Sequence, residues 1–270
     1  MAPYFMLVLS VAFGVAVSGG STGVAAAPAP GAVTMAGQLW LIKDNDLAVL
    51  GGMGSYQWVG CGMTTAPLTI DNFTPCSPGE DPIYTNYATF VADVASHALV
   101  PGDTVIFDNE TWCYTPAWER ANQGKYEKLA AQLAAANGIT FIDTPAAQNG
   151  FETIVDDVAA ARYASVVDIQ AQARDRDPTS YVAFVRKAVA AIRAVNPSIP
   201  ILAGLATDPL GRPTTVAHLV QDYQGVRDLV QGFWMNADTW AAPRGHGCAP
   251  LGCPQIGRQF LAAIGVASPS

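Results

Sequence analysis

Residues 104–142 read TVIFDNETWCYTPAWERANQGKYEKLAAQLAAANGITFI, and this stretch decides the fold class. Thr104–Phe107 is a run of β-branched and aromatic residues that predicts a buried strand. The Ala-, Leu- and Lys-rich stretch 119–137 predicts a helix that ends at Gly138. The apolar run 139–142 then predicts a second strand. A strand, a helix and a strand in this order form a βαβ unit, whose two strands lie parallel.

The same alternation of strand and helix continues along most of the chain. Further strands are expected at 39–42, 56–59, 165–169, 199–205 and 230–235, and helices at 87–99, 151–162, 181–195, 215–229 and 256–264. These make seven strands, and the poorly patterned stretch 45–85 has room for an eighth. The pattern predicts an α/β fold, namely a (β/α)8 TIM barrel or a close variant of it, in a single domain.

An open, doubly wound sheet is the alternative architecture. Such a sheet usually has a glycine-rich phosphate-binding turn after its first strand. The only glycine-rich turn near that position is Gly51-Gly52-Met53-Gly54, and no clear helical pattern follows it. A nucleotide site at this turn is therefore not expected.

The N-terminal segment differs in composition from the rest of the chain. Residues 4–17 are almost wholly apolar, but they fall short of the roughly 20 residues that span a bilayer. Ala25-Ala26-Ala27 fits a small-residue cleavage site. We therefore expect an export signal at 1–27, a flexible mature N-terminus at 28–37 and the barrel domain at 38–270, in a secreted bacterial protein. The residues before the apolar run include no Lys or Arg, so a retained N-terminal anchor is the alternative.

Composition excludes some classes of partner. The chain has 270 residues, of which 50% are hydrophobic and 13% charged, so it can bury a large core. Its 14 Lys and Arg residues stand against 22 Asp and Glu residues, for a net charge of −8, and no basic run occurs. Nucleic-acid binding requires a basic face, so no nucleic-acid partner is expected. No other stretch is apolar enough to cross a bilayer, so no stable membrane insertion is expected after signal removal.

The five cysteines are Cys61, Cys76, Cys113, Cys248 and Cys253, and export would permit them to form disulfides. Cys248 and Cys253 bracket a short turn-rich segment. Cys61 and Cys76 bracket a loop rich in Thr, Pro and Asn. Both pairs are candidate disulfides, with Cys113 left over, although sequence alone does not fix the connectivity. A zinc site is not indicated, because no Cys-x-x-Cys pair occurs and the three histidines are scattered.

Polar side chains gather just after the expected strand ends. The carboxyl ends of parallel strands meet at one edge of a barrel, and α/β barrels bind their ligands at this edge. Residues i and i+2 of a strand point to the same face. The residues that this rule groups are Asp108, Glu110 and Trp112, then Asp168, Gln170 and Gln172, and finally Trp234 and Asn236.

Asp108 and Glu110 are the two candidate residues for which the spacing most clearly indicates a catalytic role. Two carboxyl groups on one face can raise each other's pKa, so that one stays protonated as an acid while the other is an anion. Glycoside hydrolysis uses this division of labour. The candidate catalytic residues are Glu110, Asp108 and Asp168. The candidate substrate-binding residues, which offer amides for hydroxyl groups and indoles for sugar rings, are Trp112, Gln170, Gln172, Trp234 and Asn236.

Each candidate also has an ordinary structural interpretation. Strand ends often carry polar residues that cap helices or satisfy loop backbone, and large aromatics often pack in cores. The alternatives are a helix cap or a pair with Arg120 for Asp108, a buried carboxylate held by backbone amides for Asp168, loop hydrogen bonding for Gln170 and Gln172, core packing for Trp234, and a turn for Asp143 before Thr144-Pro145.

The segment Phe107-Asp108-Asn109-Glu110-Thr111-Trp112, followed by Thr115-Pro116 and Glu119, resembles a group of uncharacterised secreted actinobacterial proteins that are similar to glycoside-hydrolase-type TIM barrels. The resemblance extends over residues 104–240. The Asp-x-Glu strand end is also similar to that of barrel glycosidases in which the glutamate is the acid and the aspartate orients it. This resemblance implies that Glu110 is the acid and that Asp108 is its partner.

The longer signature of the chitinase-like barrels, Asp-x-x-Asp-x-Asp-x-Glu, is incomplete in this chain. Asp103 stands at its first position, but Ile106 occupies the place of the second aspartate. The substrate-assisted mechanism of that family is therefore not expected.

The sequence thus predicts a secreted hydrolase that acts on glycosidic bonds by carboxylate acid/base catalysis at the carboxyl-terminal rim of a barrel. No cofactor is expected, and the substrate is a carbohydrate or another small polar molecule. One alternative is a non-catalytic extracellular barrel that binds glycans with the same Trp and Asn side chains. The other is a metal-assisted hydrolase or lyase, with Asp108, Glu110 and Asp168 as oxygen ligands for Ca²⁺ or Mg²⁺.

Overall fold

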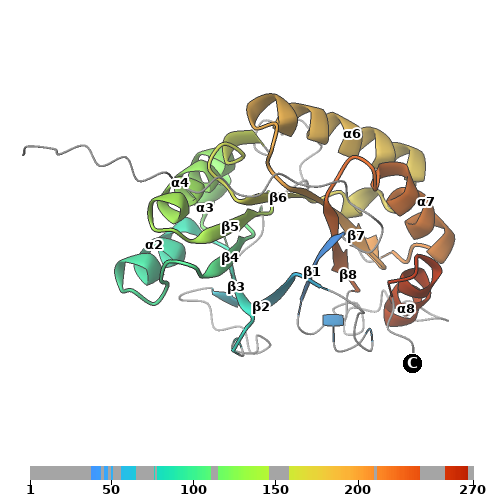
Figure 1. Cartoon of the computed structure of the whole chain (residues 1–270), viewed down its shortest axis with the longest axis horizontal. Helices are drawn as coiled ribbons and strands as arrows, with labels where there is room; N and C mark the ends of the chain where they lie inside the picture. Colours follow the sequence, from blue (N-terminus) through green and yellow to red (C-terminus); the bar gives the residue numbers. More distant parts are fainter. Residues whose placement is uncertain are drawn as a thin grey trace, which may run out of the picture. The chain divides into compact units, whose positions relative to one another are not determined.

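Eight parallel strands close into a barrel in the order of the sequence (Figure 1). The computed structural model describes residues 38–43, 46–47, 50, 56–64, 76, 78–110, 115–145, 158–209, 212–237 and 253–266. Each strand pairs with the next along the chain, and β8 pairs with β1 to close the ring. The prediction of a (β/α)8 barrel is confirmed, and the open doubly wound sheet is excluded.

The strands are β1 (Leu39–Lys43), β2 (Trp58–Thr64), β3 (Asp81–Tyr84), β4 (Thr104–Phe107), β5 (Thr140–Asp143), β6 (Val166–Ile169), β7 (Ile201–Ala206) and β8 (Gly232–Asn236). The helices are α2 (Tyr87–Ala95), α3 (Ala117–Arg120), α4 (Gln123–Ala136), the short 3₁₀ helix η2 (Gln172–Arg174), α6 (Pro178–Val195), α7 (Val216–Val226) and α8 (Cys253–Ala263).

The eighth strand is β3, inside the stretch 45–85 where the pattern left room for it. Its four residues, Asp-Pro-Ile-Tyr, contain only two buried apolar side chains, Ile83 and Tyr84. A strand this short, with a proline in it, has no periodicity that would reveal it. Its pairing with β2 and β4 supplies the structure that its own sequence does not specify.

A small apolar cluster fills the inside of the barrel. It takes one buried side chain from most of the strands: Leu41, Ile83, Ile106, Ile142, Val166, Leu202 and Trp234. On β2 the corresponding position is Gly60, where a Cβ atom would lie 2.8 Å from Ile106 Cδ1 and 3.1 Å from Ile83 Cδ1. The two isoleucines therefore occupy the space that a side chain on β2 would need. Large and small residues complement each other in this way when a barrel interior is packed.

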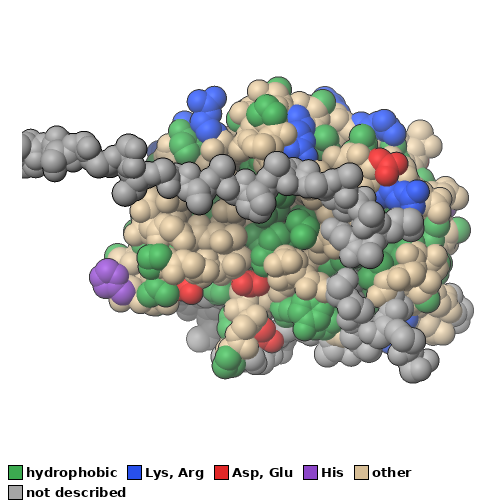
Figure 2. Space-filling view, viewed as in Figure 1, with side chains coloured by type: hydrophobic (Ala, Val, Ile, Leu, Met, Phe, Trp, Pro, Cys, Tyr) green, Lys and Arg blue, Asp and Glu red, His purple; other side chains and the backbone are tan. Residues whose placement is uncertain are grey.

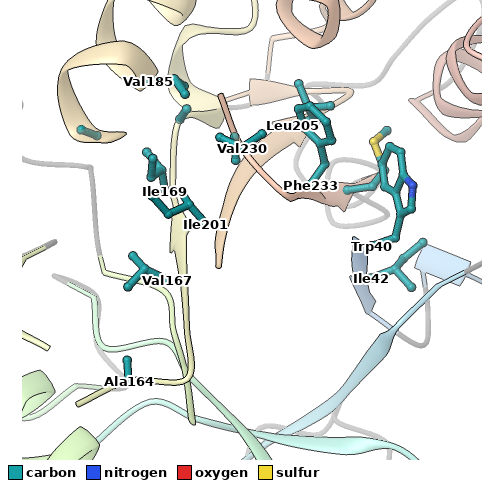
Figure 3. Close-up of a cluster of buried hydrophobic side chains, with 14 of the residues drawn as sticks. Trp40, Ile42, Ala164, Val167, Ile169, Val185, Ile201, Leu205, Val230 and Phe233 are labelled. Atoms are coloured by element: carbon teal, nitrogen blue, oxygen red, sulfur yellow. The ribbon is translucent and has the colours of Figure 1, made fainter. Parts of the chain in front are cut away.

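A larger apolar core lies between the outer face of the barrel and the helices (Figure 3). Because side chains alternate along each strand, the neighbours of the inner residues point outward. Figure 3 labels Val185 of α6 in this core. It also labels core residues of strands β1, β6, β7 and β8, namely Trp40, Ile42, Val167, Ile169, Ile201, Leu205 and Phe233.

Side-chain hydrogen bonds mark the first residues of α2 and α6. The side chain of Asn86 accepts a hydrogen bond from Thr89 N at 2.9 Å and begins α2. That helix ends at Ala95, earlier than the expected Leu99, and His97 has a positive φ of 60°. Asp177 accepts from Ser180 N at 3.2 Å and begins α6 with a proline at its first turn, three residues before the expected start.

The prediction of a single helix at 119–137 is wrong in one respect, because the structure has two helices in this region, α3 and α4. Asn122 stands between them with φ −150° and ψ 43°, outside the helical region. The carboxyl group of Glu119 in α3 is bonded to Tyr87 N of α2 rather than to groups of its own helix. Tertiary contacts therefore determine the break, whereas the end of α4 at Asn137 and Gly138, with φ +68° at Gly138, follows the predicted stop.

The structure contains a disulfide between Cys61 and Cys76, one of the two expected pairs, with a Cα–Cα distance of 5.1 Å. The side chains of Cys113, Cys248 and Cys253 lie outside the described residues, as do residues 1–37 with the expected export signal and most of the expected helix 151–162. Among the residues that the structure describes, none of the helices is long and apolar enough to cross a membrane.

Candidate functional site

The inner face of the barrel changes from apolar to polar at its carboxyl end. Ile106, Ile142 and Val166 belong to the inner apolar cluster, and the residues two positions further on are Asp108, Thr144 and Asp168, all of which are buried. The strand ladder continues beyond β4 and β5, because Asp108 N donates to Tyr84 O at 2.8 Å and Thr144 N to Phe107 O at 3.0 Å. These polar side chains therefore keep the inward orientation of the strand.

Asp108 accepts hydrogen bonds from two neighbouring segments. Gln170 Nε2 donates to Asp108 Oδ1 at 2.8 Å, and the Thr144 hydroxyl lies 3.3 Å from the same oxygen. The Thr144 hydroxyl is closer to Phe107 O, at 2.9 Å, so its single proton is divided between the two acceptors. Three successive strand ends thus converge on one carboxylate oxygen, and the contacts fix both the position and the orientation of Asp108.

The orientation of the Gln170 amide is settled by its partners. Its Nε2 atom also donates to Thr144 O at 2.8 Å, so both of its hydrogen atoms are used on acceptors. The opposite flip would place Oε1 against a carboxylate and a carbonyl. Among the described residues the Gln170 side chain makes no further hydrogen bond, so its Oε1 atom is not used by any of them.

The backbone of Glu110 is held at the same edge. Glu110 N donates to Thr115 Oγ1 at 3.2 Å, and the Thr115 hydroxyl donates to Thr85 O at 2.8 Å. Glu110 is only 5% exposed. Thr115 therefore joins the segment after β4 to the end of β3, and Glu110 stands within two residues of the Asp108 carboxylate.

Asn109, between the two acids, is fixed from the helical side. Its Nδ2 donates to Glu119 Oε2 at 2.7 Å, and Gln123 Nε2 donates to Asn109 O at 2.9 Å. Glu119 Oε2 also accepts from Tyr87 N at 2.8 Å, at the start of α2. Asp108 and Asn109 are therefore held by hydrogen bonds to β3, α3 and α4, and α2 contributes indirectly through its bond to Glu119.

Burial raises the pKa of the Glu119 carboxyl above its usual range, although hydrogen bonds from the backbone of Tyr87 and Ala88 and from Asn109 oppose that rise. Glu119 is fully buried. Through its hydrogen bonds with Tyr87 N and Asn109 Nδ2, this carboxyl group orients its neighbours.

Asp168 and Gln172 also lie inside the barrel. Asp168 is fully buried on the inner face of β6, where it pairs in register with Leu202 of β7. Gln172 belongs to η2, and its amide packs over Gly204 of β7. The structure thus gathers Asp108, Asp168 and two glutamine amides at the carboxyl end of neighbouring strands.

The two tryptophans of the predicted site have different outcomes. Trp234 is 3% exposed and belongs to the inner apolar cluster, so the structure gives it a packing position, and the predicted contact with a sugar ring stays a prediction. Asn236 is two residues further along β8, partly exposed, and pairs in register with Ala206. Trp112 lies outside the described residues.

The sequence interpretation overlooked three supporting residues. Thr144 follows the expected strand 139–142 but was given no role beside the expected turn at Asp143, while Thr115 and Glu119 entered only through a resemblance. Thr144 could have been found by extending the i, i+2 rule from Ile142. The roles of Thr115 and Glu119 depend on tertiary contacts, and no local signal indicates them.

Charges are scattered on the face of the molecule shown in Figure 2, where the described Lys and Arg side chains form no continuous stripe. Within the described ranges, no group of three or more His, Cys, Asp or Glu side chains is placed to hold a metal ion. Comparison with known proteins adds no assignment, since no protein-family model matches the chain and no curated protein is significantly similar to it.

Proposed function

We propose that this protein is a hydrolase that cleaves glycosidic bonds at the carboxyl end of its barrel. The observation that carries the proposal is the convergence of Gln170 and Thr144 on Asp108, two residues before Glu110. A carboxylate held by hydrogen bonds beside a second acid is the arrangement that glycoside hydrolysis requires.

In this mechanism Glu110 donates a proton to the oxygen of the leaving sugar. Glu110 is only 5% exposed, so protein groups and a bound sugar would exclude most of the solvent from it during the proton transfer. Asp108 accepts hydrogen bonds through Oδ1, which suits a carboxylate anion that orients the acid and stabilises positive charge on the sugar ring.

Asp168 supplies the second carboxylate of the reaction. It acts as the nucleophile, as the base that activates water, or as a stabiliser of the positively charged ring. Its burial on the inner face of β6 places it beneath Gln170, which is bonded to Asp108. Gln170, Gln172 and Asn236 offer uncharged polar groups for sugar hydroxyls around these acids.

The test is release of reducing ends from a panel of soluble tetrasaccharides by the purified protein. We expect at least one member to be cleaved, and the Glu110→Gln and Asp108→Asn variants to lose roughly 100-fold or more in kcat, since acid catalysis contributes about 10²–10⁴-fold. Asp228→Asn is the matched control, because this acid is 90% exposed and precedes β8, at the other end of the barrel.

Full activity of Glu110→Gln on a cleaved sugar would overturn the assignment of the acid. Binding of a tetrasaccharide without any cleavage would replace hydrolysis with glycan binding. Loss of activity on chelation, restored by Ca²⁺ or Mg²⁺, would favour a metal-assisted reaction.

Export is the second part of the proposal. The disulfide between Cys61 and Cys76 supports it, because such bonds persist in oxidising compartments. When the full chain is expressed in a bacterial host, we expect the protein in the medium to begin at Pro28. A chain that stays in the cytoplasm and begins at Met1 would contradict this.

A further inference from the structure

The Gln172 side chain lies inside the barrel, over a glycine of the neighbouring strand. Gly204 follows Leu202 by two residues on β7, so its missing side chain would point to the inner face. A Cβ atom there would overlap Gln172 Cδ and would lie 2.6 Å from both Nε2 and Oε1. Because these amide atoms are almost equally distant from that point, the plane of the amide faces Gly204. Any side chain at position 204 would displace it.

The turn that carries Gln172 is anchored on its far side. Asp175 N donates to Gln172 O at 3.2 Å, and the Asp175 carboxylate accepts a hydrogen bond from Ala206 N of β7. The guanidinium carbon of Arg174 lies 4.5 Å from the centre of the Phe184 ring. These contacts hold η2 against β7 and α6, so the backbone that carries Gln172 is in place before any ligand arrives.

Gly204 is fixed from the outer face as well. The Tyr181 hydroxyl donates to Gly204 O at 3.0 Å, and Gly204 pairs in register with Trp234 of β8. The backbone of Gly204 is therefore held by contacts on two sides. A methyl group on Gly204 would meet the Gln172 amide, and the amide is the group that would have to move.

Within the part of the chain that the structure describes, the Gln172 amide makes no hydrogen bond to another protein group. It is partly buried, and an amide has two N–H donors and one carbonyl acceptor to satisfy. Polar groups in such positions bond to water or to a ligand. Gln172 thus presents unused donors and an acceptor at the end of the barrel where Asp108 and Asp168 lie.

We infer that the Gln172 amide is a specificity-determining contact for hydroxyl groups of an uncharged saccharide, and that position 204 is glycine because it seats this amide. This inference rests on the proposed function. An amide matches a sugar hydroxyl, since both can donate and accept a hydrogen bond. Arg or Lys would be the expected residue for a carboxylate or phosphate group.

The experiment uses two readouts on the full-length mature protein. Steady-state kinetics are measured on cello-, xylo-, manno-, chito- and maltotetraose, and side-chain amide resonances are followed by ¹H–¹⁵N NMR during titration with the same sugars. The variants are Gln172→Ala, Gly204→Ala and their combination. Gln221→Ala is the control, because Gln221 is an exposed glutamine on α7.

We expect Gln172→Ala to raise KM about 10-fold for the cleaved sugar, with kcat changed much less, as for the loss of one or two uncharged hydrogen bonds. Gly204→Ala should raise KM in the same direction. The double variant should be no worse than Gln172→Ala, because removal of the amide leaves room for the methyl group. If Gly204→Ala fails to fold, Gln172→Ala carries the test alone.

Cleavage with an unchanged KM in Gln172→Ala would overturn this inference and leave the proposed function standing. A sugar that shifts the Gln172 resonances without being cleaved would support the inference and overturn hydrolysis. A panel in which no sugar is cleaved and none shifts these resonances would overturn both.

Discussion

Gln170 reaches across β5 to donate a 2.8 Å hydrogen bond to Asp108, so that the ends of β4 and β6, which are not neighbours in the barrel, are joined through two side chains. The same nitrogen donates to Thr144 O on the intervening segment. A buried contact of this kind orients the carboxylate more strictly than either strand could alone.

Gln170→Glu should damage the site while keeping its shape. The new carboxylate would face Asp108 and Thr144 O, both of which are acceptors, and like charges at this distance disfavour ionisation of both acids. We expect kcat to fall about 10–100-fold, which corresponds to a charged hydrogen bond of about 1.5–3 kcal/mol. Steady-state kinetics on the cleaved saccharide measure this, with Gln221→Glu on the surface of α7 as the control. Equal losses in both variants would contradict the role of Gln170.

A pair of buried acids predicts a pH-dependent stability. Asp222 of α7 is fully buried, and its carboxylate oxygens have no hydrogen-bond partner within the described part of the chain. Burial, and secondarily the charge of Asp177, raises its pKa from 3.8 to about 8. Burial and the neighbouring Asp222 likewise raise the pKa of Asp175 well above its usual range. The Tyr181 hydroxyl of α6 interacts electrostatically with both acids, and His218, whose Nδ1 is buried, lies one helical turn before Asp222 on α7.

The sign of this effect follows from proton binding. An acid whose pKa is raised by folding contributes stability that is fully present below about pH 4 and is lost as pH rises through about 8. The free energy of unfolding of Asp222→Asn should therefore fall less than that of the natural protein between pH 5 and pH 9. The difference between the two proteins should change in favour of the variant by roughly 2–5 kcal/mol, at about 1.4 kcal/mol per pKa unit. Chemical denaturation at the two pH values measures the difference. A variant that follows the natural protein at both would refute the account.

Gly232 closes the barrel and should not tolerate a side chain. A Cβ atom there would overlap Leu39 O and lie 2.7 Å from Leu39 C, within the β1–β8 pairing that completes the ring. Backbone cannot move aside without opening that pairing, so Gly232→Ala should cost about 3 kcal/mol or more or should prevent folding. Gly265→Ala is the comparison variant, because no atom lies within 4 Å of its Cβ position and its cost is confined to the strain of a positive φ of 75°, about 1–2 kcal/mol. Similar midpoints for the two variants in thermal unfolding would show that closure does not depend on this glycine.

The Cys61–Cys76 disulfide should stabilise the segment between β2 and β3. It closes a loop of 15 residues, for which the restriction of the unfolded chain amounts to about 3 kcal/mol. Replacing both cysteines with serine should lower the free energy of unfolding by about 2–4 kcal/mol. Treatment of the natural protein with a reductant should give at least this shift, since it would also open the candidate Cys248–Cys253 pair. An unchanged denaturation midpoint in both cases would contradict a stabilising role.

Much of the fold could be predicted from local pattern. Thr104–Phe107 is a strand because its residues are β-branched or aromatic, and α4 stops at Gly138 because glycine accepts a positive φ there. The location of the polar residues at one edge follows once the strands are parallel. Local pattern could not predict β3, because this strand has no apolar periodicity and is defined by its pairing with β2 and β4.

The sequence predicts which side chains lie at the carboxyl edge of the barrel, but it does not predict the contacts between them. The i, i+2 rule correctly turns Asp168 inward on β6, but it cannot show that Gln170 bonds to Asp108, because that contact depends on the register of three strands. It also cannot distinguish a tryptophan at the rim from Trp234, which packs two residues deeper. The Gln172–Gly204 contact depends on the path of η2, which has no sequence signature.

The measurement that tests the central claim most directly is tetrasaccharide cleavage by the natural protein and by Asp108→Asn, followed as the release of reducing ends. The account predicts cleavage that falls at least 100-fold in Asp108→Asn and is unchanged in Asp228→Asn. Equal rates for the natural protein and Asp108→Asn would contradict a catalytic site built around this carboxylate.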